Sequence, residues 1–418
     1  MTIIEERIIK TKKEYLITTI YAAVFIVFGL MVDTVKSIVK GLNKIINEPD
    51  ILITDYIGVG GLGASFVNAG MVALVSILIL YVLRINITGA ATSAIWLMTG
   101  FALFGKNIFN IWFIIAGVWL YSKYQKDNFS KYIFVAMFGT SLAPLVTQVM
   151  FSTALPRIVS ISLGIAIGLG VGFILPPLAA YLMRVHQGFN LYNIGFTAGI
   201  IGTIIISVFK SYGLEPEARL IWTTGNNKLL GSFLGILFLS MIAVSFILDK
   251  NVYKKFKRLF SYSGRLVTDF MVLEGFAPSL LNMGVNGIFA TGYILLVGGD
   301  LNGPTIGGIL TIVGFSSFGK HLKNMIPIFI GVYIGSILKT WNINDPSILM
   351  AALFGTTLAP IAGTFGWKYG VIAGFLHSSV VLNVGFLHGG VNLYNNGFSG
   401  GIVAATLIPI IEAIRKDE

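Results

Sequence analysis

The sequence has no cysteine and a small share of charged residues. Of its 418 residues, 11% are Asp, Glu, Lys or Arg, whereas a soluble domain carries roughly 25%. The missing cysteines exclude disulfides, thiolate metal sites and a cysteine nucleophile. The missing charges exclude a soluble enzyme and a disordered chain, because too few are present to cover a water-facing surface or to keep a chain unfolded.

Catalytic and cofactor motifs are also missing. The chain has no His-Glu-x-x-His motif, no Gly-x-x-x-x-Gly-Lys-Ser/Thr loop and no carboxylate pair of the kind that hydrolases use. Two of its histidines, His186 and His388, are not accompanied by a cluster of acids, so we expect no metal site. We therefore expect a protein that is not an enzyme and holds no cofactor, with sodium or proton coupling left open.

Apolar residues dominate what is present. They make up 55% of the chain, with 49 glycines and 31 phenylalanines, and the mean hydropathy is +0.84. Glycine lets membrane helices approach closely, and successive apolar stretches approach the length of a membrane span. The net charge of +11 reflects basic residues kept in cytoplasmic loops, not nucleic-acid binding. These features predict a multi-pass protein of the bacterial cell membrane that is surrounded by lipids.

The chain repeats itself. The segment from His186 to Ile200 returns from His388 to Ile402, with ten of 15 residues identical at an offset of 202. Further blocks return in the same order: residues 54–70 as 268–284, 100–110 as 314–324, and 138–144 as 354–360. Such matches indicate a whole-chain duplication. We predict a first repeat over 1–212, a linker over 213–228 and a second repeat over 229–418.

Loop charge indicates that the repeats have opposite orientations. Residues 250–265 carry six basic side chains and no acid, and residues 123–131 carry three lysines and one aspartate. Because basic loops stay on the cytoplasmic side, we expect both loops and both termini inside, and residues 35–50 and 210–228 outside. The expected fold is an all-α polytopic membrane protein with two homologous inverted repeats, re-entrant or broken helices and about 14 spans.

Polar residues at membrane depth are costly, and those present in both repeats are the candidates for solute binding. The asparagines of the repeated block lie at two expected helix starts. Their amide groups could bind a polar solute or, alternatively, cap the helices. Two histidines could relay protons or lie at the interface, and two lysines could attract an anion or extend to the interface. The predicted substrate-binding residues are Asn190, Asn193, Asn392, Asn395, His186, His388, Lys106 and Lys320.

A second group of matched residues is predicted to couple transport to an ion. Asp55 and Asp269 begin apolar segments, where they either cap a helix or bind a proton or cation. We expect Asp269 to be the more important of the two, because Glu274 follows it. Thr140 and Thr356 precede Leu-Ala-Pro sequences, where a helix break would free carbonyl groups to bind an ion.

The repeated His-x-Gly-x-Asn-Leu-Tyr-Asn-x-Gly-Phe and Phe-Gly-Thr-Ser/Thr-Leu-Ala-Pro blocks resemble an uncharacterised family of bacterial polytopic membrane proteins, known only as a domain of unknown function. The resemblance covers nearly the whole chain and implies no activity and no site residues. A local likeness is to urea channels, whose two inverted halves also contain Asn-x-Gly before apolar residues, as at Asn193 and Asn395. It covers only those few residues and does not imply urea as the substrate.

The sequence predicts a secondary transporter that moves a small polar or anionic solute across the bacterial inner membrane. Its site would lie between the inverted repeats, and a cation gradient would drive it. A passive channel for a small polar solute is the alternative, and a membrane-embedded lipid-modifying enzyme is a third. The expected partners are a small molecule or ion and membrane lipids, with a homodimer left open.

Overall fold

The structure is a computed structural model that describes residues 3–151, 155–216 and 219–415. Within these residues the chain folds into helices, and its only β-bridge joins Thr54 to Ile221. The linker between the repeats therefore pairs with the segment that precedes the third helix of the chain.

Ten helices of the first repeat have ten counterparts in the second. The first ten are α1 (Ile3–Val32), α2 (Val35–Ile46), α3 (Tyr56–Gly60), α4 (Leu62–Val82), α5 (Gly89–Phe101), α6 (Ile111–Tyr124), α7 (Ile133–Gly139), α8 (Ala143–Phe151), α9 (Arg157–Leu182) and α10 (Asn193–Ser211). Their counterparts are α11 (Asn227–Leu248), α12 (Val252–Leu259), α13 (Phe270–Leu273), α14 (Phe276–Leu296), α15 (Gly303–Phe315), α16 (Leu322–Leu338), α17 (Pro346–Gly355), α18 (Ala359–Phe365), α19 (Trp367–Val384) and α20 (Asn395–Arg415). The matching order confirms two homologous repeats.

Ten stretches in the described chain are long and apolar enough to cross a membrane, five in each repeat. They are α1, α4, the joined α7–α8, α9 and α10, together with their counterparts in the second repeat. The expected number was about 14, and the difference of four corresponds to the shorter helices α5, α6, α15 and α16. The 13 residues of α5 rise about 20 Å, less than the thickness of the hydrocarbon core.

The short helices α5 and α6 form a hairpin that begins and ends on one face of the molecule. Gly89, at the start of α5, donates a hydrogen bond to Asp269, and Lys131, after α6, lines the same cavity as Leu266. Both ends of this hairpin therefore lie on one face of the molecule. At its tip, Asn107 donates to the carbonyl of Ile45, beside the loop on the opposite face.

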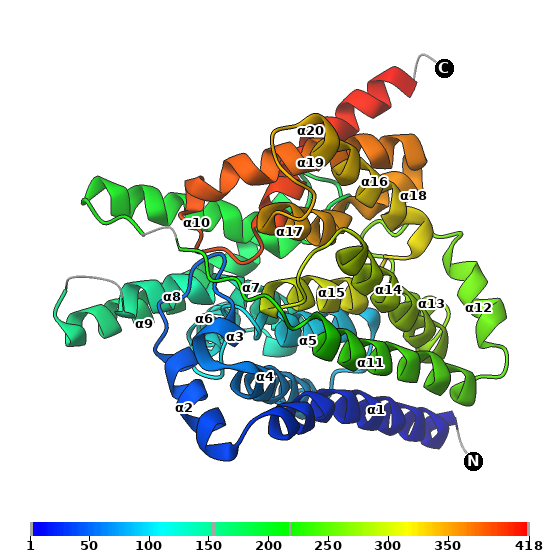
Figure 1. Cartoon of the computed structure of the whole chain (residues 1–418), viewed down its shortest axis with the longest axis horizontal. Helices are drawn as coiled ribbons and strands as arrows, with labels where there is room; N and C mark the ends of the chain where they lie inside the picture. Colours follow the sequence, from blue (N-terminus) through cyan, green and yellow to red (C-terminus); the bar gives the residue numbers. More distant parts are fainter. Residues whose placement is uncertain (1–2, 152–154, 217–218, 416–418) are drawn as a thin grey trace.

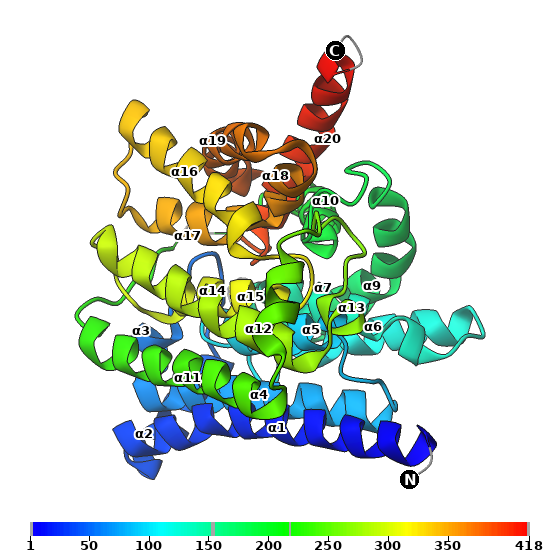
Figure 2. The same cartoon turned by 90° about the vertical axis from the view of Figure 1, so that its right-hand side faces the viewer.

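The two repeats are inverted relative to one another. In Figure 1, α1 runs from the N label on the right to α2 on the left, whereas α11 runs from left to right and ends at α12. Figure 2 shows the same opposed directions. Each repeat has five candidate spans, an odd number, which agrees with this arrangement.

The loops separate onto the two faces as their charges predicted. Arg219 of the linker forms an ion pair with Glu48, so the linker and the 35–50 loop share a face. On the other face lie α12, the start of α1 and the end of α20 (Figure 1). Leu266, in the loop after α12, donates its peptide hydrogen to the carbonyl of Gly188. Which face is cytoplasmic remains a prediction from charge.

The repeats meet along a pseudo-twofold axis at the starts of α10 and α20. A methyl group placed on Gly195 would lie 3.1 Å from the Cα of Gly397, so the two helices touch through backbone. The rings of Tyr192 and Tyr394 lie 4.8 Å apart beside this contact. Both helices begin near the axis, and a non-helical segment precedes each of them.

Candidate functional site

The extended segments insert into the breaks of the opposite repeat. Leu191 donates its peptide hydrogen to the carbonyl of Thr357, and Leu393 donates to that of Ser141, each at 3.0 Å. The receiving carbonyls lie in short 3-10 turns, Thr140–Leu142 and Thr356–Leu358, that interrupt α7–α8 and α17–α18. The helix breaks predicted at the Leu-Ala-Pro sequences are present, and two of the carbonyls at these breaks bind the other repeat.

Asn190 and Asn392 bind across the axis. Asn190 donates its amide hydrogen to the Gly397 carbonyl at 2.9 Å, and Asn392 donates to the Gly195 carbonyl at 3.2 Å. Their amide oxygens accept the peptide hydrogens of Tyr192 and Tyr394. These two asparagines therefore lie at the axis, where they hold the two repeats together.

Asn193 and Asn395 are bound within their own repeats. The Nε2 of His186 lies 2.9 Å from the amide oxygen of Asn193, whose nitrogen donates to the carbonyl of Ala179 at 3.1 Å. His388 and Asn395 repeat this pair, also at 2.9 Å. Each histidine keeps a buried Nδ1 without a hydrogen-bond partner. The oxygen and the nitrogen of each asparagine side chain are both hydrogen-bonded. The two His–Asn pairs therefore fix the starts of α10 and α20.

The two predicted lysines are completely buried close to the axis. The Nζ of Lys320 donates to the hydroxyl of Tyr192 at 2.5 Å and to that of Thr356 at 2.7 Å. The Nζ of Lys106 has weaker partners, the Met98 sulfur at 3.4 Å and the Met137 carbonyl at 3.5 Å. Neither lysine belongs to an ion pair among the described side chains.

Two asparagines outside the predicted set hold the loops that carry these lysines. Asn68 of α4 donates to the carbonyls of Ala102, at 2.7 Å, and Lys106, at 2.9 Å. Asn282 of α14 makes the matching bonds to Ser316 and Lys320, both at 2.7 Å. The sequence signal for these residues was present, because Asn68 and Asn282 match between the repeats in apolar surroundings.

A cavity of about 470 Å³ leads from one face toward the axis. Lys131, Leu266 and Val267 line its outer part, and Tyr192, Tyr394 and Phe315 are also among its lining residues. Because Lys320 bonds to Tyr192, it lies directly behind the cavity wall. Val267 is 77% exposed at the mouth.

The matching segment on the other face is covered. Ile53 is the counterpart of Val267, and it is only 7% exposed. The linker covers it: Ile221 donates to the Ile53 carbonyl at 3.0 Å and accepts from the Asp55 peptide at 3.2 Å. The segment around Val267 in the second repeat is therefore exposed, whereas the segment around Ile53 in the first repeat is covered.

Asp55 and Asp269 bridge the repeats as helix caps. Asp55 Oδ1 accepts the peptide hydrogens of Ile57, at 3.0 Å, and of Gly303 at the start of α15, at 3.1 Å. Asp269 Oδ1 accepts those of Val272, at 3.1 Å, and of Gly89 at the start of α5, at 2.9 Å. Each carboxylate thus caps a short helix of its own repeat and a re-entrant helix of the other.

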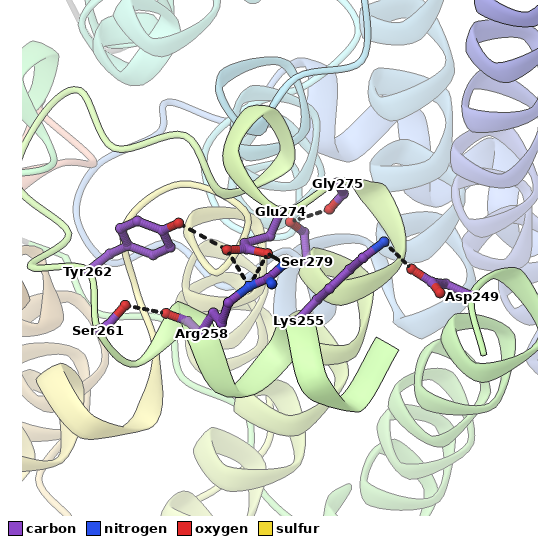
Figure 3. Close-up of polar contacts among 8 residues, drawn as sticks. All are labelled: Asp249, Lys255, Arg258, Ser261, Tyr262, Glu274, Gly275 and Ser279. Carbon is purple, nitrogen blue, oxygen red and sulfur yellow. Dashed lines mark hydrogen bonds and ion pairs between the residues drawn. The ribbon is translucent and has the colours of Figure 1, made fainter. Parts of the chain in front are cut away.

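Glu274 does not join Asp269 in a shared acidic site. It pairs with Arg258 of α12 at 2.6 Å and accepts a hydrogen bond from Tyr262 at 3.0 Å (Figure 3). Burial raises the pKa of Glu274, but the bonds from Arg258 and Tyr262 outweigh it and leave the pKa below its usual value. Glu274 therefore holds α12 in place through its ion pair with Arg258.

Comparison with known proteins identifies a family whose function is unknown. The model of a family described as "Protein of unknown function (DUF1576)" matches residues 34–211 and 248–413. These two regions correspond to the two repeats. No curated protein and no solved structure matches the chain.

Proposed function

The chain belongs to the DUF1576 family, and we propose that it is a secondary transporter for a small anionic solute, which passes between the two inverted repeats. The observation that carries the proposal is the buried pair Lys106 and Lys320 beside the axis, with no ion pair to either lysine in the described chain. The proposed location is the bacterial inner membrane, with both termini cytoplasmic.

The energetics of a buried ammonium group support an anionic solute. Removing an unpaired charge from water costs several kcal/mol, and neutral hydroxyl or thioether partners recover only part of that cost. Lys320 has two hydroxyl partners, whereas Lys106 has a sulfur, a carbonyl and the face of the Phe101 ring, at 4.9 Å from its centroid. An anion that reached Lys106 or Lys320 would supply the missing charge.

The difference between the two faces favours a carrier. A cavity reaches the tyrosine pair from the face of Val267, while the face of Ile53 is covered. A carrier must close one side while the other is open, and inverted repeats provide two such states. The channel alternative is favoured by the bonds of Asn190 and Asn392 across the axis, because these bonds restrain movement of α10 against α20.

The proposal is tested with purified protein in proteoliposomes. Currents or uptake are recorded for a panel of small anions, namely formate, acetate, lactate, nitrate, bicarbonate and phosphate. We expect at least one anion to be moved by the wild type, and Lys320→Met to abolish that movement. Lys339→Met is the matched control, because Lys339 binds the Phe375 carbonyl and the Ser378 hydroxyl away from the axis.

Lys320→Arg separates charge from packing. It keeps the positive charge and should retain part of the activity. A Lys320→Met variant that folds and moves the anion as fast as wild type would overturn the proposal. A rate that rises linearly with anion concentration without saturating would favour the channel.

A further inference from the structure

Asp50, between α2 and α3, is a buried carboxylate that the axial site does not use. Its side chain is 0% exposed. Its Oδ2 accepts hydrogen bonds from the hydroxyl of Thr147, at 3.1 Å, and from the amide of Asn110, at 3.2 Å. Its Oδ1 is buried without a hydrogen-bond partner. A carboxylate half of which lacks partners is poorly stabilised as an anion.

The groups around Asp50 suit a proton better than a metal cation. Asn110 faces the carboxylate with its NH₂ group, because its oxygen accepts the peptide hydrogen of Asn107 at 2.9 Å. Thr147 and Tyr56 bring hydroxyl groups to the same place. Hard cations need a shell of several oxygen ligands. A neutral carboxyl group needs none, so protonation removes the unfavourable charge.

Asp50 also contacts the loop that carries Lys106. The same Asn110 amide nitrogen that donates to Asp50 donates to the carbonyl of Gly105 at 3.1 Å. Gly105 directly precedes Lys106. One amide group therefore connects the carboxylate to the peptide that positions the buried lysine.

The second repeat has no carboxylate at this place. The counterparts of Asp50 and Thr147 are Gly264 and Gly363. The carbonyl of Ser263 fills the space, since a methyl group on Gly363 would collide with it. Asn324, the counterpart of Asn110, bonds to Gly319 and to this carbonyl. The arrangement around Asp50 thus belongs to one repeat only.

From this geometry we propose that Asp50 is a proton-binding site that couples proton movement to the movement of the anion. The inference rests on the proposed function. With Asp50 ionised, Oδ2 holds the Asn110 amide and, through it, the Gly105 carbonyl. Protonation removes the charge from that bond and lets the loop shift Lys106 relative to the solute. One proton carried with one monovalent anion makes the cycle electroneutral.

Two titratable groups face Asp50, and they act in opposite directions. The hydroxyl of the buried Tyr56 favours the ionised carboxylate, whereas Glu48, an acid that pairs with Arg219, disfavours it. Burial, with a smaller effect from Glu48, raises the pKa of Asp50 well above the usual range of an aspartate. Ionisation therefore destabilises the folded protein, and stability should fall as the pH rises through the elevated pKa of Asp50.

Proton binding is measured on purified protein without any solute. The melting temperature of the wild type should decline as the pH is raised above the ordinary carboxyl range, and Asp50→Asn should remove that decline. Infrared spectra should lose the band of one protonated carboxyl group in the same variant. Glu215→Gln, which changes a largely exposed acid, is the control and should leave both signals unchanged.

A second variant keeps the test decisive if Asp50→Asn does not fold. Thr147→Val removes a donor to the ionised carboxylate, so it should move the decline to higher pH. If neither variant changes the pH dependence and the infrared band persists in Asp50→Asn, the proton site is refuted.

Coupling is measured in the proteoliposomes, with the anion that the wild type moves and with an imposed pH gradient. Asp50→Asn should lose the component driven by the gradient and retain exchange of anion for anion. Anion movement by the wild type that ignores the gradient would overturn the coupling but leave the transporter proposal intact. Normal titration of Asp50 in a protein that moves no anion would overturn the proposed function instead.

Discussion

The segments that lead to the axis from the two faces, residues 51–55 and 265–269, have similar sequences and different surroundings. Ile53 and Asp55 lie beneath the linker, which bonds to both residues, whereas Val267 is exposed. The helices of the two repeats nevertheless correspond one to one. The difference shows that the closing element is a segment present once in the chain, added to a symmetric framework.

The first test of the comparison concerns positions where the repeats should be equivalent. Gly195→Leu would force a side chain to within 2.7 Å of the Tyr394 Cβ, and Gly397→Leu to within 2.9 Å of the Tyr192 Cβ. We expect each to cost about 3 kcal/mol or more and to prevent folding or lower the melting temperature sharply. Gly235→Leu, where nothing lies within 4 Å, should be tolerated.

Equal effects at Gly195 and Gly397 would establish that both repeats depend on the same backbone contact. A clear difference between the two variants would show that the axis is not shared equally.

The second test concerns the two capping aspartates. Asp55 accepts the peptide hydrogen of Thr223 at 3.1 Å and its hydroxyl, in addition to the two helix ends. Asp269 has no linker partner among its described bonds, although its Oδ2 also accepts from Ala90 at 3.3 Å. Because an Asn side chain has one acceptor oxygen, we expect Asp55→Asn to cost about 2 kcal/mol and Asp269→Asn about 1 kcal/mol.

Thermal melts of both variants measure this difference. The sequence favoured Asp269 as the more sensitive residue because of Glu274, but that acid is tied to Arg258. Equal melting temperatures would indicate that the linker bonds add nothing to the fold. Loss of gradient-driven uptake in Asp269→Asn alone would return the coupling role to that residue.

Much of the fold was accessible from the sequence. The duplication and the inversion could be predicted because identical blocks and loop charges lie in the sequence itself. The number of spans could not, because the residues of α5 and α6 are as apolar as those of a crossing helix, and only their folding back shows that they do not span. The bond of Asn190 to Gly397 was inaccessible for another reason, since it joins residues 207 positions apart.

The candidate site shows a bias of the sequence approach. Matching residues between repeats selects symmetric positions such as Lys106 and Lys320. It passes over Asp50, whose counterpart is Gly264. Coupling requires only one carboxylate, so the residue that breaks the symmetry is the one this comparison cannot detect.

The third test measures the openness of the two faces directly. The chain has no cysteine, so Ile53→Cys and Val267→Cys can each be labelled alone. Exposures of 7% and 77% lead us to expect labelling at least about tenfold faster at position 267 with a membrane-impermeant maleimide. Asn43→Cys and Ser261→Cys mark the two faces, and they should label from opposite sides of the membrane.

This labelling also tests the carrier. Saturating anion should change the ratio of the two rates if the protein alternates between its faces. A constant ratio would support a channel, and labelling of positions 43 and 261 from one side would contradict the inverted arrangement.

The smallest expected effect concerns how the two repeats hold their surface helices. In the first repeat α2 packs on α3 through glycine, because a methyl group on Gly41 would collide with the Gly60 carbonyl. The counterpart of Gly60 is Glu274, which ties α12 to the start of α14 through Arg258.

Removing this ion pair should therefore loosen α12 and leave α2 unchanged. Arg258 is 54% exposed, so water screens the pair, and we expect Glu274→Gln to cost only about 0.5–1 kcal/mol. The pKa of Glu274 lies below its usual value, so the pair stabilises the fold above the pKa of an unfolded glutamate and is lost as the pH falls through the lower, folded value. Hydrogen exchange of α12 amides at neutral pH should then rise in Glu274→Gln while exchange in α2 stays constant. In acid, below both pKa values, the variant and the wild type should exchange alike. A difference that persists there would show that Glu274 acts through packing and not through its charge.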